Sequence, residues 1–203
     1  MVEQQIAARG IRDRAVLDAM VEVPRSAFVP SELAEFAHDD TALPIAAGQT
    51  ISQPYIVAAM VEALELGPDD TVLEVGSGSG YAAAVMSRIA SRVLAIERHD
   101  ELVESSREVL RDLGYTNIDV RAGDGTLGWP EEAPFDAVVV TAGADSIPPA
   151  LIEQLAPGGR LVMPVGDPNV DQQLVLLEKD ASGRVASKRL LPVRFVPLLR
   201  GVR

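Results

Sequence analysis

The feature of this chain that most constrains its fold is a short apolar run that ends in a glycine turn. Thr71–Val75 has the composition of a buried strand, and glycines at 76, 78 and 80 alternate with serines in the next five residues. The Ala-rich residues 81–90 then favour a helix. A strand, a tight glycine turn and a helix in this order are typical of an open α/β sheet that binds a ligand at the carboxyl ends of its strands.

The same alternation continues through most of the chain. Further strands are predicted at 92–96, 118–122, 135–140 and 160–165, with helices at 100–113 and 148–155. The strand-like runs 173–178 and 185–197 have no helix between them, which predicts an antiparallel edge on an otherwise parallel sheet. Residues 13–23 and 56–64 have helical periodicity, and 28–48 form an ordered loop with short turns. We therefore expect one domain over 1–203, a doubly wound Rossmann-like α/β core (70–203) with an N-terminal helical extension (1–69).

Composition excludes several classes of protein. The chain has no cysteine, which rules out disulfides, zinc–thiolate sites and thiol nucleophiles. It has only two histidines, His38 and His99, which argues against a His-based metal site, and we expect no metal. Thirty acidic residues against eighteen basic ones give a net charge of −12, which argues against a nucleic-acid partner. No apolar run approaches the ~18 residues of a membrane span, and no secretory signal is visible. We expect a cytoplasmic protein that does not bind membranes.

The basic residues are concentrated at the carboxyl end. The stretch from Ser182 to Arg203 contains basic side chains but no acidic one. This pattern fits either a solvated edge strand or a local attraction for an anionic substrate group.

The acid that precedes the glycine turn indicates the charge of the ligand. Glu74 is followed by a Gly-x-Gly-x-Gly spacing, which differs from the Gly-x-Gly-x-x-Gly pattern of dinucleotide-binding proteins. A carboxylate at this position repels a pyrophosphate and suits a cation such as a sulfonium or an α-amino group. The pattern favours S-adenosylmethionine over NAD, although an ordinary strand-to-helix turn would have the same glycines.

Two further acids follow predicted strands. Glu97 lies 19 residues beyond Gly78 at the end of the next strand, where an acid can accept hydrogen bonds from both ribose hydroxyls or simply begin a helix. Asp124 lies between Gly123 and Gly125 after the third strand. It is either a turn residue or a partner for the exocyclic amine of adenine.

Several motifs of this chain resemble those of the protein-L-isoaspartate O-methyltransferase family over nearly its whole length. The most diagnostic is Thr50-Ile51-Ser52-Gln53-Pro54, because the glycine turn is shared by many methyltransferases. The other matching segments are Val23-Pro24-Arg25, Phe28-Val29-Pro30, Leu43-Pro44-Ile45, Leu73 to Tyr81, Gly123-Asp124-Gly125, Gly128-Trp129, Ala133 to Asp136, Leu155 to Leu161 and Phe195-Val196-Pro197-Leu198. The chain departs from the family pattern at His38, where a tyrosine is usual.

The resemblance implies a role for each matching residue. Ser52 corresponds to the active-site serine, so that the extension 1–69 carries the substrate-side motif, and Val196 to Leu198 lie beside the substrate peptide. The cofactor is S-adenosylmethionine, held by Thr50, Ile51, Glu74, Gly76, Gly78, Glu97, Asp124 and Gly125. The partners are proteins and peptides that contain isoaspartyl residues, and we expect a monomer.

The expected reaction needs no general base. The acceptor is the free α-carboxylate of an isoaspartyl residue, which is ionised at neutral pH because its pKa is near 4. Ser52 then orients the acceptor by a hydrogen bond, although its position also fits a helix N-cap. The resemblance implies that the ester cyclises to a succinimide, which begins repair. Three alternatives stay open: a methyltransferase for another peptide carboxylate, a non-catalytic cofactor-binding module, and an NAD-linked oxidoreductase.

Overall fold

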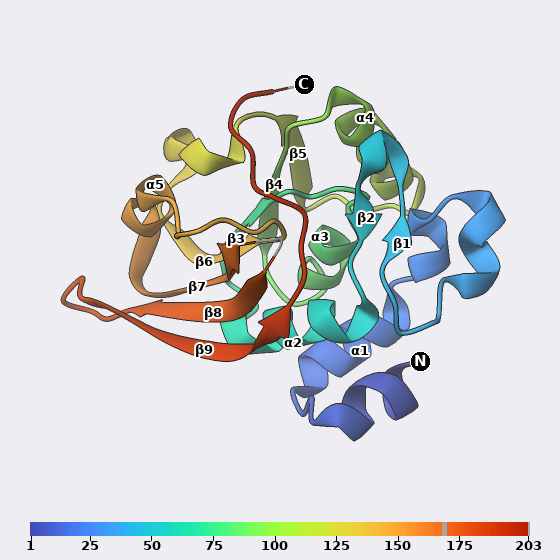
Figure 1. The fold of residues 1–203 in the computed structure, drawn as a ribbon, viewed down its shortest axis with the longest axis horizontal. Coiled ribbons are helices and arrows are strands. Elements are labelled where there is room, and N and C mark those ends of the chain that lie inside the picture. Colours follow the sequence, from blue (N-terminus) through green and yellow to red (C-terminus); the bar gives the residue numbers. More distant parts are fainter. Residues whose placement is uncertain (168–169, 203) are drawn as a thin grey trace.

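A computed structural model of the chain describes residues 1–167 and 170–202, and its centre is a large mixed β-sheet. Among these residues, seven strands form the sheet in the order β5-β4-β3-β6-β7-β8-β9 (Figure 1). Their bounds are β3 Thr71–Val75, β4 Arg92–Glu97, β5 Ile118–Ala122, β6 Phe135–Val140, β7 Leu155–Asp167, β8 Asp171–Lys179 and β9 Val185–Val193. Within the series β5, β4, β3, β6 and β7, neighbouring strands pair parallel, whereas β8 pairs antiparallel with both β7 and β9. The predicted fold class and its antiparallel edge are confirmed.

The two faces of the sheet bury separate apolar clusters. Successive side chains of a strand point to opposite faces, so Val72 belongs to the larger cluster, whereas Leu73 and Val75 belong to the smaller one. The helices α1 (Arg14–Glu22), α2 (Pro54–Leu64), α3 (Tyr81–Met86) and α4 (Asp100–Asp112) contribute to the larger cluster, and α5 (Pro149–Glu153) contributes to the smaller one. Glu74 shares the face of Val72, and this face is the one that the larger group of helices covers.

The N-terminal third combines the two predicted helices α1 and α2 with short elements. The short helices are η1 Val2–Ile6, η2 Ala7–Arg9, η3 Arg25–Phe28, η4 Ser31–Phe36 and η5 Ala46–Gly48. An antiparallel hairpin of β1 (Leu43–Pro44) and β2 (Thr50–Ile51) lies between η4 and α2, and periodicity did not predict it because each strand has two residues. Two more short helices, η6 Gly125–Leu127 and η7 Pro130–Glu132, follow β5. None of the helices described is both long and apolar enough to cross a membrane.

Three predicted elements end at least two residues earlier than expected. The helix predicted over 148–155 spans only Pro149–Glu153, and Leu155 already begins β7. The helix predicted to Ala90 ends at Met86, and the strand predicted to Pro197 ends at Val193. Beyond β9 the chain leaves the sheet edge and crosses the carboxyl ends of the central strands (Figure 1). There the N–H of Gly143 donates to the carbonyl of Val196 over 2.8 Å, and the N–H of Leu198 donates to the carbonyl of Gly143 over 2.7 Å. These bonds to Gly143 replace further pairing with β8.

Candidate active site

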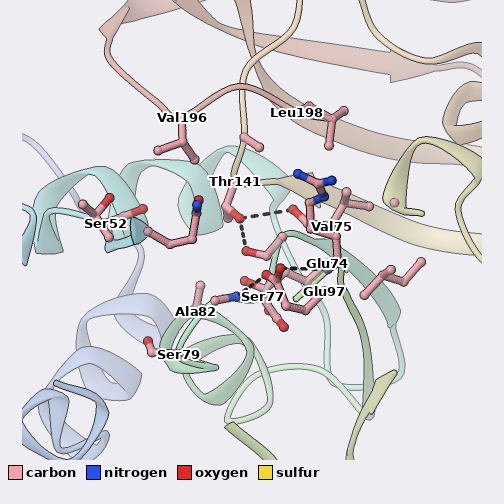
Figure 2. Close-up of a pocket in the computed structure, with 18 of the residues that line it drawn as sticks. Ser52, Glu74, Val75, Ser77, Ser79, Ala82, Glu97, Thr141, Val196 and Leu198 are labelled. Atoms are coloured by element: carbon pink, nitrogen blue, oxygen red, sulfur yellow. Dashed lines mark hydrogen bonds between the residues drawn. The ribbon is translucent and has the colours of Figure 1, made fainter. Parts of the chain in front are cut away.

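A cavity lies where the strand order reverses, at the carboxyl ends of the neighbouring strands β3 and β6. Ligands of open α/β sheets bind at this point. Of the predicted site residues, all except Asp124 line the cavity: Thr50, Ile51, Ser52, Glu74, Gly76, Gly78, Glu97, Gly125, Val196 and Leu198. Figure 2 shows Val196 and Leu198 across the cavity from Glu74 and Glu97, so the C-terminal segment forms one wall.

The glycine turn has a conformation that side chains would disturb. Gly76 and Gly78 have positive φ angles of 87° and 52°, which glycine adopts without steric cost. A Cβ on Gly76 would lie 2.9 Å from the hydroxyl oxygen of Thr141. That hydroxyl donates to the carbonyls of Val75, over 3.1 Å, and of Gly76, so the turn is tied to the segment after β6. The predicted tight turn is confirmed, and it opens onto the cavity.

Glu74 is a buried carboxylate without a partner. It is only 1% exposed, and neither carboxylate oxygen has a hydrogen bond within the described chain. Burial and then the neighbouring charge of Glu97 raise the pKa of Glu74 to about 8, which the nearby N–H of Ala83 opposes. An acid this deeply buried is costly unless a cation or hydrogen-bond donor meets it. A cation or hydrogen-bond donor bound in the cavity that Glu74 lines would supply this partner.

Glu97 is held in place by backbone amides on the same face of the sheet as Glu74. Its Oε2 accepts from the N–H of Gly78 over 3.0 Å, and its Oε1 accepts from Arg98 over 2.7 Å and His99 over 3.0 Å. A carboxylate offers about four lone-pair sites, so Glu97 keeps the capacity to accept from a ligand hydroxyl. It therefore links the glycine turn to the end of β4, and Figure 2 shows Glu97 close to Glu74.

These groups match the chemistry of S-adenosylmethionine. An ionised Glu74 would attract a sulfonium or ammonium group, and Glu97 would accept hydrogen bonds from ribose hydroxyls. The hydroxyl of Ser77, buried in the same turn, also lacks a hydrogen-bond partner. Two unpartnered polar side chains beside a glycine cradle fit a ligand that is both cationic and rich in donors.

Ser52 lies where this cavity meets a second one. The second cavity is lined by Asp40, Thr41, Ala42, Thr50, Ser52, Gln53, Ile56, Thr141 and residues 192–196. Thr50, Ser52, Thr141 and Val196 line both cavities. A group bound in the second cavity would thus meet a ligand of the first one beside Ser52.

The interpretation of Ser52 as a helix N-cap is wrong. The N-cap of α2 is Gln53, and its side chain makes no capping hydrogen bond. The carboxylate of Asp40 takes over this task by accepting from the N–H of Tyr55 over 3.1 Å and from the Gln53 side chain over 2.7 Å. The Ser52 hydroxyl is therefore not needed to begin the helix.

Asp124 lies beside the cavity but does not line it. Its Oδ1 accepts from the N–H and hydroxyl of Thr126 over 2.9 and 2.7 Å, and its Oδ2 accepts from the N–H of Gly201 over 2.8 Å. Burial raises the pKa of Asp124, but these hydrogen bonds outweigh that effect and hold it below the ordinary value. Asp124 is therefore a turn residue, which was one of its two predicted roles. Gly125, the next residue, lines the cavity.

Thr141 is a site residue that the sequence reasoning missed. It follows β6, which pairs with β3 at the reversal of strand order. The predicted central position of residues 135–140 would have been enough to mark the next polar side chain as a candidate.

The strand order and the buried carboxylate before a glycine turn at the reversal point define an α/β protein of the methyltransferase class. The family model for protein-L-isoaspartate(D-aspartate) O-methyltransferase matches residues 1–203, and the chain belongs to this family.

Individual proteins agree with this assignment. The chain is 59% identical over 202 residues to a protein-L-isoaspartate O-methyltransferase from Methylorubrum extorquens, covering 100% of this chain and 88% of the relative. A solved protein-L-isoaspartate O-methyltransferase is 30% identical with a TM-score of 0.85, and the match covers 97% of this chain and 65% of that longer one. A structure from Plasmodium falciparum, described as a putative member in complex with S-adenosyl-L-homocysteine, is 28% identical with a TM-score of 0.81, covering 98% and 96% of the two chains.

Proposed function

We propose that this chain methylates the free α-carboxylate of L-isoaspartyl residues in damaged proteins and peptides, with S-adenosylmethionine as the methyl donor. The observation that carries the proposal is the meeting of two cavities at Ser52, one of which contains the unpartnered carboxylate of Glu74. Family membership supports the acceptor, and the solved relative with S-adenosyl-L-homocysteine supports the donor.

The first cavity, which contains Glu74 and is called the donor cavity below, holds its ligand through carboxyl groups that are in place before the ligand binds. S-adenosylmethionine supplies a methyl group on a positively charged sulfur. Glu74 attracts the cationic methionine end, the glycine turn lets that end approach the backbone, and Glu97 accepts from the ribose hydroxyls. Thr50, Ile51 and Gly125 enclose the remainder, and Asp124, beside the cavity, is proposed as the partner of the adenine amine. Because the carboxylates and the turn are already in place, binding reorders little of the chain.

The second cavity, called the acceptor cavity below, has to align a carboxylate that is already reactive. An ionised carboxylate attacks the methyl carbon, the bond from carbon to sulfur breaks, and the electron pair stays on sulfur. No proton has to move, so catalysis depends on alignment, which can lower a barrier by roughly 7–11 kcal/mol. Ser52 donates a hydrogen bond that orients the acceptor, while Val196 and Leu198 contact the flanking peptide. The resulting ester then leaves and closes to a succinimide, because the next peptide nitrogen attacks the ester carbonyl, loses its proton and displaces methanol.

A labelled methyl-transfer assay tests this proposal. S-adenosylmethionine with a labelled methyl group is incubated with an isoaspartyl peptide and with its aspartyl twin. Label on the first peptide alone is the expected result. Label on both peptides would indicate a methyltransferase for other carboxylates, and cofactor binding without label on either would indicate a non-catalytic module.

The cytoplasmic location, the monomeric state and the single-domain boundaries stay predictions.

A further inference from the structure

Arg25 is a fully buried cation that the reaction does not use. It is 0% exposed, and its guanidinium donates to three backbone carbonyls: Ala37 over 2.6 Å, Thr41 over 3.1 Å and Ser52 over 3.1 Å. Within the described chain, no carboxylate forms an ion pair with it. Burial lowers the pKa of Arg25, although Tyr81 and Asp40 oppose this, and a guanidinium stays charged at neutral pH. Burying a charge costs free energy. We therefore ask which parts of the site the contacts of Arg25 hold in place.

Two of the three carbonyls belong to the base of the β1–β2 hairpin. Thr41 lies just before β1, and Ser52 directly follows β2. One guanidinium nitrogen, Nη2, donates to both, so a single group holds the two ends of the hairpin together. Thr41 and Ser52 also both line the second cavity, where the acceptor is proposed to bind. The shape of that cavity therefore depends on Arg25.

The residues that follow Ser52, at the start of α2, are held by a second charged group. Asp40 accepts from the Gln53 side chain, from the Tyr55 N–H and from Arg9. Ser52 thus follows a hairpin whose ends are fixed by Arg25 and precedes a helix whose start is fixed by Asp40. The hydroxyl of Ser52 itself is left without a hydrogen bond to the described chain and lines both cavities.

We propose that Arg25 is a positioning residue that sets the Ser52 turn for the acceptor carboxylate. It acts through the Ser52 and Thr41 carbonyls and does not touch the substrate. Its buried positive charge also favours an anion near the Ser52 turn. This inference rests on the proposed function, since it needs a carboxylate acceptor in the second cavity.

The test compares Arg25→Gln and Arg25→Lys with a matched control. Arg107→Met is that control, because Arg107 also donates to a backbone carbonyl, that of Val120 over 2.8 Å, but from α4 and outside both cavities. For each variant, KM and kcat for an isoaspartyl peptide, the Kd of S-adenosyl-L-homocysteine and the thermal midpoint are measured. A displacement of about 1 Å can cost on the order of 10²-fold in rate, so Arg25→Gln is expected to lower kcat/KM by about that factor.

The pattern across the measurements separates positioning from folding. We expect the peptide KM to rise far more than the Kd of the nucleoside, Arg25→Lys to restore part of the loss, and Arg107→Met to change neither constant. An unchanged peptide KM in a folded Arg25→Gln variant overturns the proposal, as does an equal weakening of nucleoside and peptide. If Arg25→Gln does not fold, Arg25→Lys decides alone: a wild-type KM overturns the proposal, because an ammonium cannot form the same fork. A wild-type protein that transfers no methyl group would instead overturn the proposed function.

Discussion

Replacing Glu74 by glutamine should make cofactor binding lose its dependence on pH. In the free protein the pKa of Glu74 is raised to about 8 by burial and by Glu97, so at pH 7 the side chain is mostly protonated. A cationic ligand favours the ionised form. Binding must therefore expel a proton, amounting to about nine-tenths of a proton at pH 7 and about one-tenth at pH 9. The Glu74→Gln variant has no such proton to release.

The same shift predicts how the stability of the free protein varies with pH. A carboxyl whose pKa rises from 4.5 to about 8 on folding stabilises the fold fully below pH 4.5, and this contribution is lost as the pH rises through 8. At about 1.36 kcal/mol per pKa unit, the total is at most roughly 5 kcal/mol. For a chain of this length that corresponds to a shift in Tm on the order of 10 °C. Glu74→Gln should remove this decline while weakening the binding of S-adenosylmethionine.

Calorimetry in buffers of different ionisation enthalpy measures the proton release directly. Thermal unfolding of the free protein between pH 5 and 9 measures how much stability is lost as the pH rises. Glu104→Gln, which removes an exposed acid of α4, is the control for net charge. Equal proton release by wild type and Glu74→Gln, or equal affinity for the cofactor, would refute the assignment of Glu74 as the partner of the cation.

Three further substitutions have distinct expected results. Ser52→Ala should lower methyl transfer and leave Tm unchanged, because this serine caps no helix; a fall in Tm of several degrees would show a structural role instead. Gly76→Ala should destabilise the protein by more than the roughly 1–2 kcal/mol of left-handed backbone strain. Gly183→Ala, at a φ of 84° with open space around it, should show the strain alone, and equal unfolding free energies for the two variants would count against crowding at the turn. Glu97→Gln should weaken nucleoside binding and cost roughly 2 kcal/mol of unfolding free energy, because three amides lose a charged acceptor; isothermal titration and denaturant unfolding measure both, and unchanged values would contradict the role.

Much of the donor side could be predicted because consecutive residues determine it. The buried runs 71–75 and 92–96 mark adjacent parallel strands, and the alternation of side chains puts Glu74 and Glu97 on one face. The glycines then show where the backbone turns. Each of these signals is local, so no contact between distant segments had to be guessed.

The acceptor side depends on contacts that leave no local pattern. Arg25 reaches Ser52 across 27 residues and Asp40 reaches Gln53 across 13, and neither spacing has a periodicity to detect. The two-residue strands β1 and β2 are too short for alternation to show. Asp124 shows a different difficulty. An Asp between glycines readily accepts hydrogen bonds from nearby backbone N–H groups, as it does here from Thr126, so its local sequence does not reveal whether it also meets a ligand. The roles that the resemblance implied for these residues stay predictions.

A crystal structure with S-adenosyl-L-homocysteine and an isoaspartyl peptide tests the central claim most directly. We expect the ammonium group within hydrogen-bond distance of Glu74, the ribose hydroxyls on Glu97, and the isoaspartyl carboxylate on the Ser52 hydroxyl, facing the sulfur across the boundary of the two cavities. A nucleoside bound away from the glycine turn, or a peptide carboxylate without contact to Ser52, would contradict the account.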